Sequence, residues 1–394
     1  MRVLIFNSLY HPNAIGGAEG SVRILAEGLV KQGIDVTVVS TADKDSFSNI
    51  EGVRAFYIKV PNLYWMKHSK EKPKMLKPLW HLIDSYNPFV NMKLNMIFNQ
   101  EKPDIIHTNN LGGFSIAVWS MAQKRNIPIV HTIRDHYLLC PKSVMFKNNR
   151  NCDNQCLSCK VYSISRKKLS NKINAVIGVS KFILDKHLQY GCFNDVKIKT
   201  HIYNAVDTIE AKEKSTARSE LITFGFIGML SPIKGIEYLL QRFSGIDSSN
   251  ARLKIFGRGI TKSYESQLRE EYGSENIEFV GHQSTKDIYN NLDVVVIPSL
   301  CDDSFPRVVM ESYSYGLPII TSNMGGAHEM VDEGKTGFIF DPANYEKFIE
   351  TIHRFIHNPG LAHEMSDACL EKAKVFSVDR LISEVWDIYK KVLN

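Results

Sequence analysis

Two acidic side chains, Asp303 and Glu311, have the residue types and the spacing that most clearly suggest chemistry in this chain of 394 residues. An apolar run at 294–297 and a proline precede them, so Asp303 is expected on a loop at the carboxyl end of a strand and Glu311 in the first turns of the next helix. Ionised carboxylates accept hydrogen bonds from hydroxyl groups, which sugars and ribose offer. The pair therefore indicates a site for a hydroxyl-rich ligand; the alternative is an ordinary solvated helix face.

The elements that must position such a pair follow one pattern in each half of the chain. Residues 3–6 are apolar and are followed by a glycine-containing loop, an amphipathic stretch that ends at Gly33 and a second apolar run at 35–39. The pattern restarts at 223–228, after the polar residues 210–218, which read as a linker. Further strands are predicted at 104–107, 127–130, 175–179, 253–257, 277–280, 294–298 and 318–321. This β-α-β order predicts an α/β protein with a doubly wound parallel sheet in each half.

Composition limits the classes of function. The formal net charge is +6, which favours anionic ligands or an anionic membrane surface, and no nucleic-acid recognition motif accompanies it. No apolar run reaches the length of a membrane-spanning helix. The first residues lead directly into a strand pattern without a signal-peptide cleavage site, so a cytoplasmic location is expected.

Four of the seven cysteines lie close together, in a loop at 140–159. An odd number of cysteines without a signal peptide argues against a framework of disulfides. The spacing C-x11-C-x3-C-x2-C offers four thiolates, enough for a structural zinc site made by Cys140, Cys152, Cys156 and Cys159. Free thiols or reversible disulfides are the alternative.

A lysine-rich segment follows the first strands. It holds five lysines against one acid, Glu71, and aromatic residues flank it. Aromatic side chains beside a basic cluster are typical of a membrane interface, and a solvated basic loop is the alternative. The lysines and aromatics concerned are Lys67, Lys70, Lys72, Lys74, Lys77, Tyr64, Trp65 and Trp80.

An ordered series of motifs resembles glycosyltransferase family 4, whose members are retaining enzymes with the GT-B fold. The two acids are followed by Gly-Leu-Pro at 316–318, by Gly-Gly-Ala-His-Glu at 325–329 and by Gly-Lys-Thr-Gly-Phe at 334–338. Upstream, 226–235 is similar to the family's diphosphate clamp. Gly-Gly-Ala-Glu at 16–19, Ser-Lys at 180–181 and Asn-Ala-Val-Asp at 204–207 also match, so the resemblance spans nearly the whole chain.

The resemblance implies two Rossmann-like doubly wound domains that face a central cleft. Residues 1–207 would form an N-terminal acceptor-side domain that carries the Cys-rich loop, and 208–377 a C-terminal domain that binds the nucleotide sugar. Residues 378–394 would form a helix that crosses back to the first domain.

The resemblance also implies roles for individual residues. Lys234 would neutralise the departing diphosphate, Glu311 would hold the ribose and Asp303 would face the transferred sugar. Arg134 and Asp135 would have catalytic roles in the N-terminal, acceptor-side domain. Because cations and backbone amides would stabilise the diphosphate, no catalytic metal is expected. Backbone or side-chain groups of Gly16, Gly17, Gly228, Arg258, Arg307, Gly325 and Gly326 would complete the donor site.

The sequence departs from the family pattern at three positions. Met229 replaces the arginine of the clamp, so Arg307 or Arg258 would have to compensate. Asp303 is one methylene shorter than the usual glutamate. Arg134 stands where relatives carry a sugar-contacting histidine, and the nearby His131 and His136 are either substitutes for it or ordinary loop residues.

The function implied is transfer of a sugar from a nucleotide-sugar donor to a glycan or lipid-linked acceptor, in synthesis of a bacterial surface polysaccharide such as O-antigen (lipopolysaccharide), capsule or exopolysaccharide. The enzyme would be cytoplasmic or peripheral on the cytoplasmic face of the inner membrane. A GT-B epimerase or phosphorylase is a second interpretation. A third, motivated by Met229 and Arg134, is a catalytically impaired protein that binds nucleotide or glycan.

Overall fold

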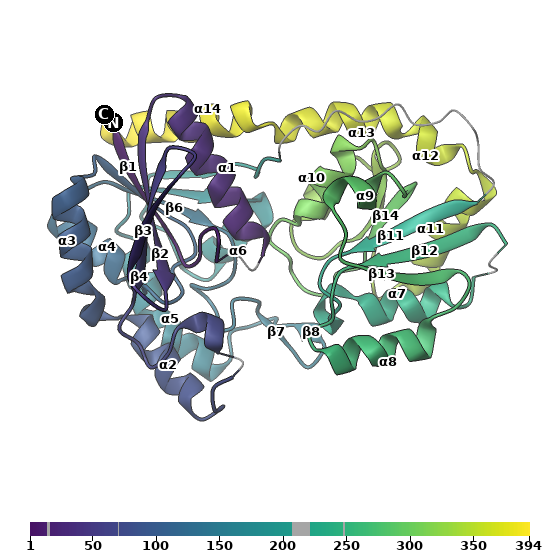
Figure 1. Ribbon diagram of the computed structural model, residues 1–394, viewed down its shortest axis with the longest axis horizontal. Helices are drawn as coiled ribbons and strands as arrows, with labels where there is room; N and C mark the ends of the chain where they lie inside the picture. The colour runs from purple at the N-terminus through teal and green to yellow at the C-terminus, as the bar shows by residue number, and fades with distance from the viewer. Residues whose placement is uncertain (14–15, 70, 207–220, 247–248) are drawn as a thin grey trace. The chain divides into compact units, whose positions relative to one another are not determined.

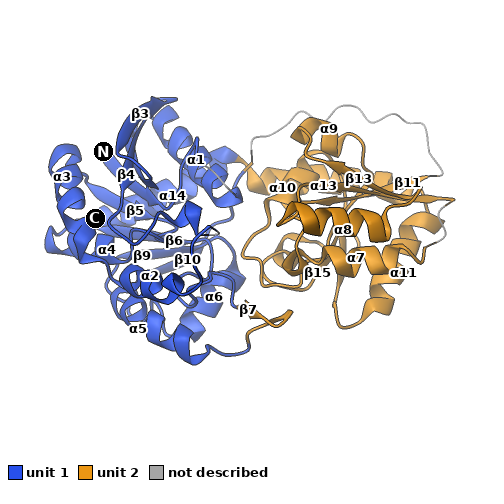
Figure 2. Cartoon of the chain, turned by 60° about the horizontal axis from the view of Figure 1, so that its bottom comes forward, with its two compact units in different colours: residues 1–145, 153–205, 378–394 blue, residues 146–152, 206–377 orange. Residues whose placement is uncertain are grey.

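The computed structural model describes residues 1–13, 16–69, 71–206, 221–246 and 249–394. The chain divides into two compact units (Figure 2). Unit 1 comprises residues 1–145, 153–205 and 378–394, and unit 2 comprises 146–152 and 206–377. The predicted linker at 210–218 and the domain boundary predicted between 207 and 208 lie outside the described residues.

Unit 1 is built on an eight-stranded sheet with the strand order β10-β9-β6-β5-β1-β2-β4-β3. Neighbouring strands are parallel except β3 and β4, which form an antiparallel pair at one edge. The strands are β1 (Arg2–Asn7), β2 (Asp35–Ala42), β3 (Ser46–Ile50), β4 (Val53–Lys59), β5 (Ile105–Thr108), β6 (Ile129–Ile133), β9 (Ala175–Gly178) and β10 (Ile198–His201). The strand order reverses beside β1, where ligands usually bind in such sheets.

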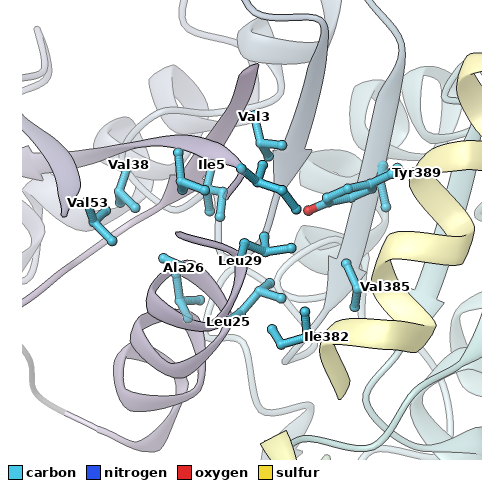
Figure 3. Packing of buried hydrophobic residues seen from close by; sticks show 14 of the residues in the cluster. Val3, Ile5, Leu25, Ala26, Leu29, Val38, Val53, Ile382, Val385 and Tyr389 are labelled. Carbon is cyan, nitrogen blue, oxygen red and sulfur yellow. The ribbon is translucent and has the colours of Figure 1, made fainter. Parts of the chain in front are cut away.

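The helices of unit 1 include the last segment of the chain. They are α1 (Gly17–Lys31), η1 (Met66–His68), α2 (Leu76–Ser85), η2 (Pro88–Val90), α3 (Asn91–Glu101), α4 (Ala117–Lys124), α5 (Leu157–Ser170), α6 (Lys181–Gln189) and α14 (Val378–Leu393). Helix α14 runs beside α1 (Figure 1), and Ile382 and Val385 pack with Leu25 and Leu29 in one apolar cluster (Figure 3). A Cβ on Gly28 would lie 2.6 Å from the Ile382 side chain, so a larger residue here would require Ile382 to shift.

Unit 2 contains a six-stranded parallel sheet with the order β13-β12-β11-β14-β15-β16, which reverses between β11 and β14. Its strands are β11 (Ile222–Ile227), β12 (Ala251–Phe256), β13 (Ile277–Gly281), β14 (Val294–Ile297), β15 (Ile319–Ser322) and β16 (Gly337–Phe340). A small hairpin of β7 (Phe146–Lys147) and β8 (Arg150–Asn151) also belongs to this unit.

The helices of unit 2 alternate with its strands. They are η3 (Pro232–Lys234), α7 (Ile236–Phe243), α8 (Lys262–Tyr272), α9 (Thr285–Tyr289), α10 (Arg307–Ser314), η4 (His328–Met330), α11 (Tyr345–His357), α12 (Leu361–Glu364), α13 (Ser366–Ala373) and η5 (Lys374–Phe376). In neither unit do the described residues include a helix that is long and apolar enough to cross a membrane.

Candidate active-site residues in the two units

The loop between β14 and α10 places Asp303 at the carboxyl edge of the unit 2 sheet, as the sequence predicts. The Lys234 ammonium group donates a hydrogen bond to the Asp303 carboxylate and forms an ion pair with it. Lys234 ends the short helix η3 after β11, and the Ile233 carbonyl accepts the N–H groups of Leu300 and Cys301. The loops after β11 and β14 are thereby joined by backbone and by charge.

The Lys234–Asp303 pair is partly open to solvent. The two side chains are 34% and 17% exposed, respectively. Burial alone would lower the pKa of Lys234, but the negative charge of Asp303 and the hydrogen bond to it outweigh burial and raise that pKa above its ordinary value. Lys234 therefore carries a fixed positive charge that a diphosphate could use in place of Asp303.

Gly325 and Gly326 lie directly against Asp303. The Gly326 N–H donates a 2.7 Å hydrogen bond to the Asp303 carbonyl. Gly325 has a φ of +67°, and a Cβ on it would lie 2.1 Å from the same carbonyl oxygen. Only glycine permits this approach, so the loop after β15 joins the loops that carry Lys234 and Asp303.

Glu311 is held in place by two partners. Its carboxylate accepts a 2.9 Å hydrogen bond from the Tyr289 hydroxyl, at the end of α9, and pairs with Arg307 at 3.1 Å within α10. Tyr289 is buried and stacks on Tyr315. The Arg307 Nη1 atom is buried and has no hydrogen-bond partner among the described residues. The sequence did not indicate Tyr289, because a single tyrosine at a helix end carries no motif.

Gly228, Met229 and Arg258 come together where β11 and β12 end. The Gly228 carbonyl would lie 1.8 Å from a Cβ on Gly257, and the Leu230 N–H donates to the Arg258 carbonyl at 2.9 Å. Met229, in place of the family's arginine, is 49% exposed, and Arg258 is exposed in the adjacent turn. Arg258 is thus close to the position that lacks the clamp arginine.

In unit 1, Arg134 follows β6 at the carboxyl edge of the sheet. It donates to the side-chain oxygens of Asn109 at 2.8 Å and Asn204 at 2.7 Å, and so connects the segments that follow β5, β6 and β10. Asp135 accepts the Tyr137 N–H at 2.7 Å. Burial raises the pKa of Asp135 to about 6, and the negative charge of Glu19 adds to that rise.

The two histidines near this loop are core residues. His131 is buried on β6, with Thr108 at 2.9 Å and the rings of Trp119 and Phe193 beside it. Burial lowers its pKa to about 3, so it remains neutral. His136 is also buried and stacks on another histidine ring. Their surroundings favour the ordinary structural interpretation over a role as the missing catalytic histidine.

Gly16 is the N-cap of helix α1 and Gly17 is its first residue, but one of the two amides already has a partner. The Gly16 N–H donates a 2.9 Å hydrogen bond to the Glu19 carboxylate, which forms a capping box at the start of α1. An anion at this helix N-terminus would therefore meet the negative charge of Glu19. The sequence led us to expect a Gly16 amide that is free to bind a diphosphate, whereas in the structure Glu19 already accepts its hydrogen bond.

The Cys-rich loop is divided between the units. Cys140, Cys156 and Cys159 belong to unit 1, and Cys152 belongs to unit 2. The thiols of Cys140 and Cys156 neighbour Cys159, and burial together with these thiols raises the pKa of Cys159. Among the described residues, no group of three or more His, Cys, Asp or Glu side chains meets the geometry of a metal site. The zinc site stays a prediction.

One residue of this loop reaches the acidic loop of unit 2. The Asn151 side chain donates to the Leu300 carbonyl at 3.1 Å and accepts the Asp302 N–H at 3.0 Å. It thereby fixes the backbone beside Asp303. An asparagine in a polar loop gives no sequence signal for such a contact.

Matches with known proteins agree with these features. Residues 15–210 match the family model described as Glycosyltransferase Family 4, and 207–374 match that of Glycosyl transferases group 1. An uncharacterized 42.6 kDa protein in the cps region of Klebsiella pneumoniae is 32% identical over 392 residues, 99% of this chain and 100% of the relative. The capsular polysaccharide biosynthesis glycosyltransferase CapM of Staphylococcus aureus is 23% identical, over 90% of this chain and 88% of CapM.

Solved structures show the same fold. Sucrose-phosphate synthase from Thermosynechococcus elongatus aligns with a TM-score of 0.79 at 18% identity, over 99% of this chain and 98% of that one. Anabaena HepE in complex with UDP-glucose aligns with a TM-score of 0.73 at 18% identity, over 99% of this chain and 100% of that one. With two Rossmann-like domains and matches along its length, the chain belongs to glycosyltransferase family 4 and has the GT-B fold.

Proposed function

We propose that this chain is a retaining glycosyltransferase that moves a sugar from a nucleotide-sugar donor to a glycan or lipid-linked acceptor in synthesis of a bacterial surface polysaccharide. The observation that carries the proposal is the arrangement around Asp303. A lysine, a glycine pair and an acidic loop from three strand ends meet there at the carboxyl edge of one sheet.

The donor side of the proposal assigns a separate task to each group. Lys234 exchanges its partner Asp303 for the diphosphate and stabilises the charge that develops as the glycosidic bond breaks. Asp303, thus released, faces the transferred sugar. Glu311, already oriented by Tyr289, accepts hydrogen bonds from the ribose hydroxyls. Arg307 and Arg258 supply the positive charge that Met229 does not.

The acceptor side of the proposal belongs to unit 1. Arg134, fixed by two asparagines, and Asp135, with its raised pKa, follow β6 at the carboxyl edge of that sheet; the guanidinium group donates a hydrogen bond to the acceptor hydroxyl, and the Asp135 carboxylate accepts the proton that this hydroxyl loses. The surface-polysaccharide context is supported by the cps-region relative and by CapM. Charge on the leaving group is met by lysine, arginine and backbone amides, so the proposed mechanism assigns no step to a metal ion.

Structural zinc in the Cys-rich loop is a separate part of the proposal. Its support is the sequence spacing and the proximity of three thiols in unit 1. Protein purified without added metal is expected to contain about one zinc per chain, since four thiolates close one tetrahedral site. Metal-free protein in which all four thiols react freely while it remains folded would contradict this part alone.

The donor is tested by thermal denaturation with UDP-, GDP- and ADP-sugars, because a ligand of the folded state raises the apparent stability. The sugar that raises Tm is then incubated with candidate acceptor lipids and glycans, and nucleotide release and the anomeric configuration of the product are measured. Release with retention is expected, and an inverted product would contradict the proposed mechanism.

A catalytically impaired binding protein is the second candidate. The exposed Met229 in the clamp favours it, because a thioether cannot pair with phosphate. Donor binding without nucleotide release under any acceptor condition, by protein whose fold is intact, would support this alternative over transfer.

A further inference from the structure

Helix α2 in unit 1 turns an apolar face outward. Leu76, Leu79 and Leu82 are exposed at helical spacing, whereas Trp80 and Asp84 point into the unit and are buried. Water-exposed leucines in a row of this kind are unusual, because a surface helix normally turns its apolar stripe inward. The neighbouring Met75 and Tyr86 extend the row at both ends, and both are exposed.

Helix α5 repeats the feature. Leu157, Val161 and Ile164 are exposed at spacings of four and three residues, and Leu157 and Ile164 are 79% and 66% exposed. The stripe lies opposite the buried side of the helix, which carries Cys159 and Arg166.

The two apolar stripes form one surface. Helices α2 and α5 pack side by side (Figures 1 and 2). The Tyr162 hydroxyl donates to the Pro78 carbonyl at 3.1 Å, and the Ser165 hydroxyl donates to the Ser85 carbonyl at 3.2 Å. These contacts lie on the flanks of the helices, so each stripe faces outward on the side away from the core. We name the six residues Leu76, Leu79, Leu82, Leu157, Val161 and Ile164 the α2–α5 face.

Positive charge surrounds the α2–α5 face. Helix α5 contains no acidic residue, and the single acid of α2, Asp84, is buried in an ion pair with Arg166. The exposed basic residues around the face are Lys72, Lys74, Lys142, Lys160 and Lys168. Glu71 and Asp153 are exposed acids at its margins. An apolar surface with a lysine border is complementary to the acyl chains and anionic headgroups of a bilayer.

This surface differs from the membrane contact expected from the sequence. Trp80 is 6% exposed, its indole N–H donates to the Tyr64 carbonyl at 2.9 Å, and its ring stacks on that of Tyr64. The Trp65 indole N–H donates to Thr41 at 2.9 Å. Trp80 therefore stabilises the fold and is not exposed as an interfacial anchor, whereas the six residues of the α2–α5 face are exposed.

We propose that the α2–α5 face of unit 1 docks on the surface of an anionic phospholipid bilayer, with its apolar side chains in the interfacial region and its lysines at the headgroups. Neither helix is long enough to cross the bilayer, so the contact is peripheral. Docking brings the carrier of a lipid-linked acceptor to the unit that we assign to the acceptor, but it does not depend on catalysis.

The test is co-sedimentation of the full chain with vesicles of phosphatidylcholine alone and with added phosphatidylglycerol. Leu79→Glu/Ile164→Glu is expected to lower partition onto the anionic vesicles by roughly tenfold or more, because it places two carboxylates in the apolar stripe. Val375→Glu/Leu393→Glu adds the same two charges at exposed apolar residues on η5 and α14; it is the matched control and is expected to bind like the parent. Circular dichroism and donor-induced shifts in Tm report whether each variant is folded.

A second pair of variants tests the basic border. Replacing Lys72, Lys74 and Lys160 by Gln is expected to weaken binding to anionic vesicles and to leave the weaker binding to neutral vesicles unchanged. The control replaces three exposed lysines elsewhere, Lys31, Lys262 and Lys391, with the same change in net charge.

The outcomes separate the occupants of this face. Equal vesicle binding by Leu79→Glu/Ile164→Glu and the parent would overturn the proposal, as would equal weakening by both lysine triples. A parent that fails to bind vesicles but forms a dimer that the double variant lacks, measured by sedimentation, would assign the face to a second copy of the chain and also overturn it. A parent protein that binds vesicles but releases no nucleotide from any donor would contradict the proposed function and leave the membrane-docking proposal intact.

Discussion

Removing the charge of Lys234 is the most direct test of the donor site. Lys234→Met keeps most of the aliphatic stem and removes the ammonium group, and Lys234→Ala removes both. The lysine is one third exposed and pairs with Asp303, so the ion pair contributes about 1 kcal/mol or less to the free energy of unfolding. Both variants should therefore remain folded, with nearly the Tm of the parent.

The effect on the reaction should be much larger than the effect on stability. Charge develops on the diphosphate as the glycosidic bond breaks, and a preorganised donor of this kind lowers the barrier by about 2–4 kcal/mol. The expected loss in kcat is therefore roughly 30- to 1000-fold. Because Met229 offers no charge in the same clamp, the loss should lie toward the upper end. Loss of Lys234 also frees Asp303, whose negative charge would repel the donor phosphates and raise KM.

The assay is nucleotide release under steady-state conditions with the donor found by thermal denaturation. Lys262→Ala, which removes an exposed lysine of the same unit at the start of α8, is the control for net charge and should keep the kcat of the parent. A folded Lys234→Met enzyme with normal kcat would refute the assignment of this lysine to the leaving group, and with it the reading of the Asp303 loop as the donor site.

Three further changes probe the surroundings of the two sites. Tyr289→Phe should weaken donor affinity about three- to tenfold, because the Glu311 carboxylate loses a hydrogen bond. Tyr315→Phe should leave donor affinity unchanged, because the Tyr315 hydroxyl has no hydrogen-bond partner in the described part of the chain. Titrating both variants with the donor separates the effect of the hydroxyl from that of the ring stack. Gly325→Ala should abolish nucleotide release, because its Cβ would lie 2.1 Å from the Asp303 carbonyl oxygen. Gly334→Ala has a similar φ of +73° but open space around it, so it should cost only about 1 kcal/mol of stability. Equal activities of the two variants would contradict the close approach at Gly325. The raised pKa of Asp135 favours its protonated form in the folded state, so the protonated carboxyl contributes to the free energy of unfolding below about pH 4, and this contribution is lost as the pH rises to about 6 and above. Relative to Asp135→Asn, the parent should lose roughly 1–3 kcal/mol of its free energy of unfolding between pH 4 and 7 in denaturant titrations. Parallel pH profiles of the two proteins would contradict the raised pKa.

Nine of the ten strands expected from apolar runs are internal strands of the two sheets and are largely buried on both faces; the tenth, β13, is an edge strand that still carries an apolar run. All ten strands expected from apolar runs are present, as β1, β2, β5, β6, β9 and β11–β15. The strands that were missed include the edges of the unit 1 sheet, β3 and β10, whose residues are partly or fully exposed and mostly polar. An edge strand is specified by the partner to which it is added, so its own residues carry little periodic signal.

For the candidate site, the sequence predicts which residues follow which strands, but not the contacts between their side chains. The family motifs place Lys234, Asp303 and Glu311 after strands, and parallel topology brings those strand ends to one edge. They do not reveal that Lys234 pairs with Asp303 or that Tyr289 orients Glu311, because both contacts depend on how separate loops pack. The capping of Gly16 by Glu19 was also missed, although the glutamate three residues after a helix start is a recognised capping pattern.

The Cys-rich loop contributes a structural contact to the candidate site through Asn151. The chain leaves unit 1 after residue 145, forms the β7–β8 hairpin in unit 2 and returns to unit 1 at 153. At the end of that excursion one amide side chain satisfies both the Leu300 carbonyl and the Asp302 N–H, the groups that flank the turn into Asp303. A loop without a core of its own needs anchoring on both sides of such a contact, and Cys140 precedes the hairpin while Cys156 and Cys159 follow it. Cysteines therefore stand on both sides, in sequence, of the hairpin whose Asn151 holds the backbone beside the proposed catalytic acid.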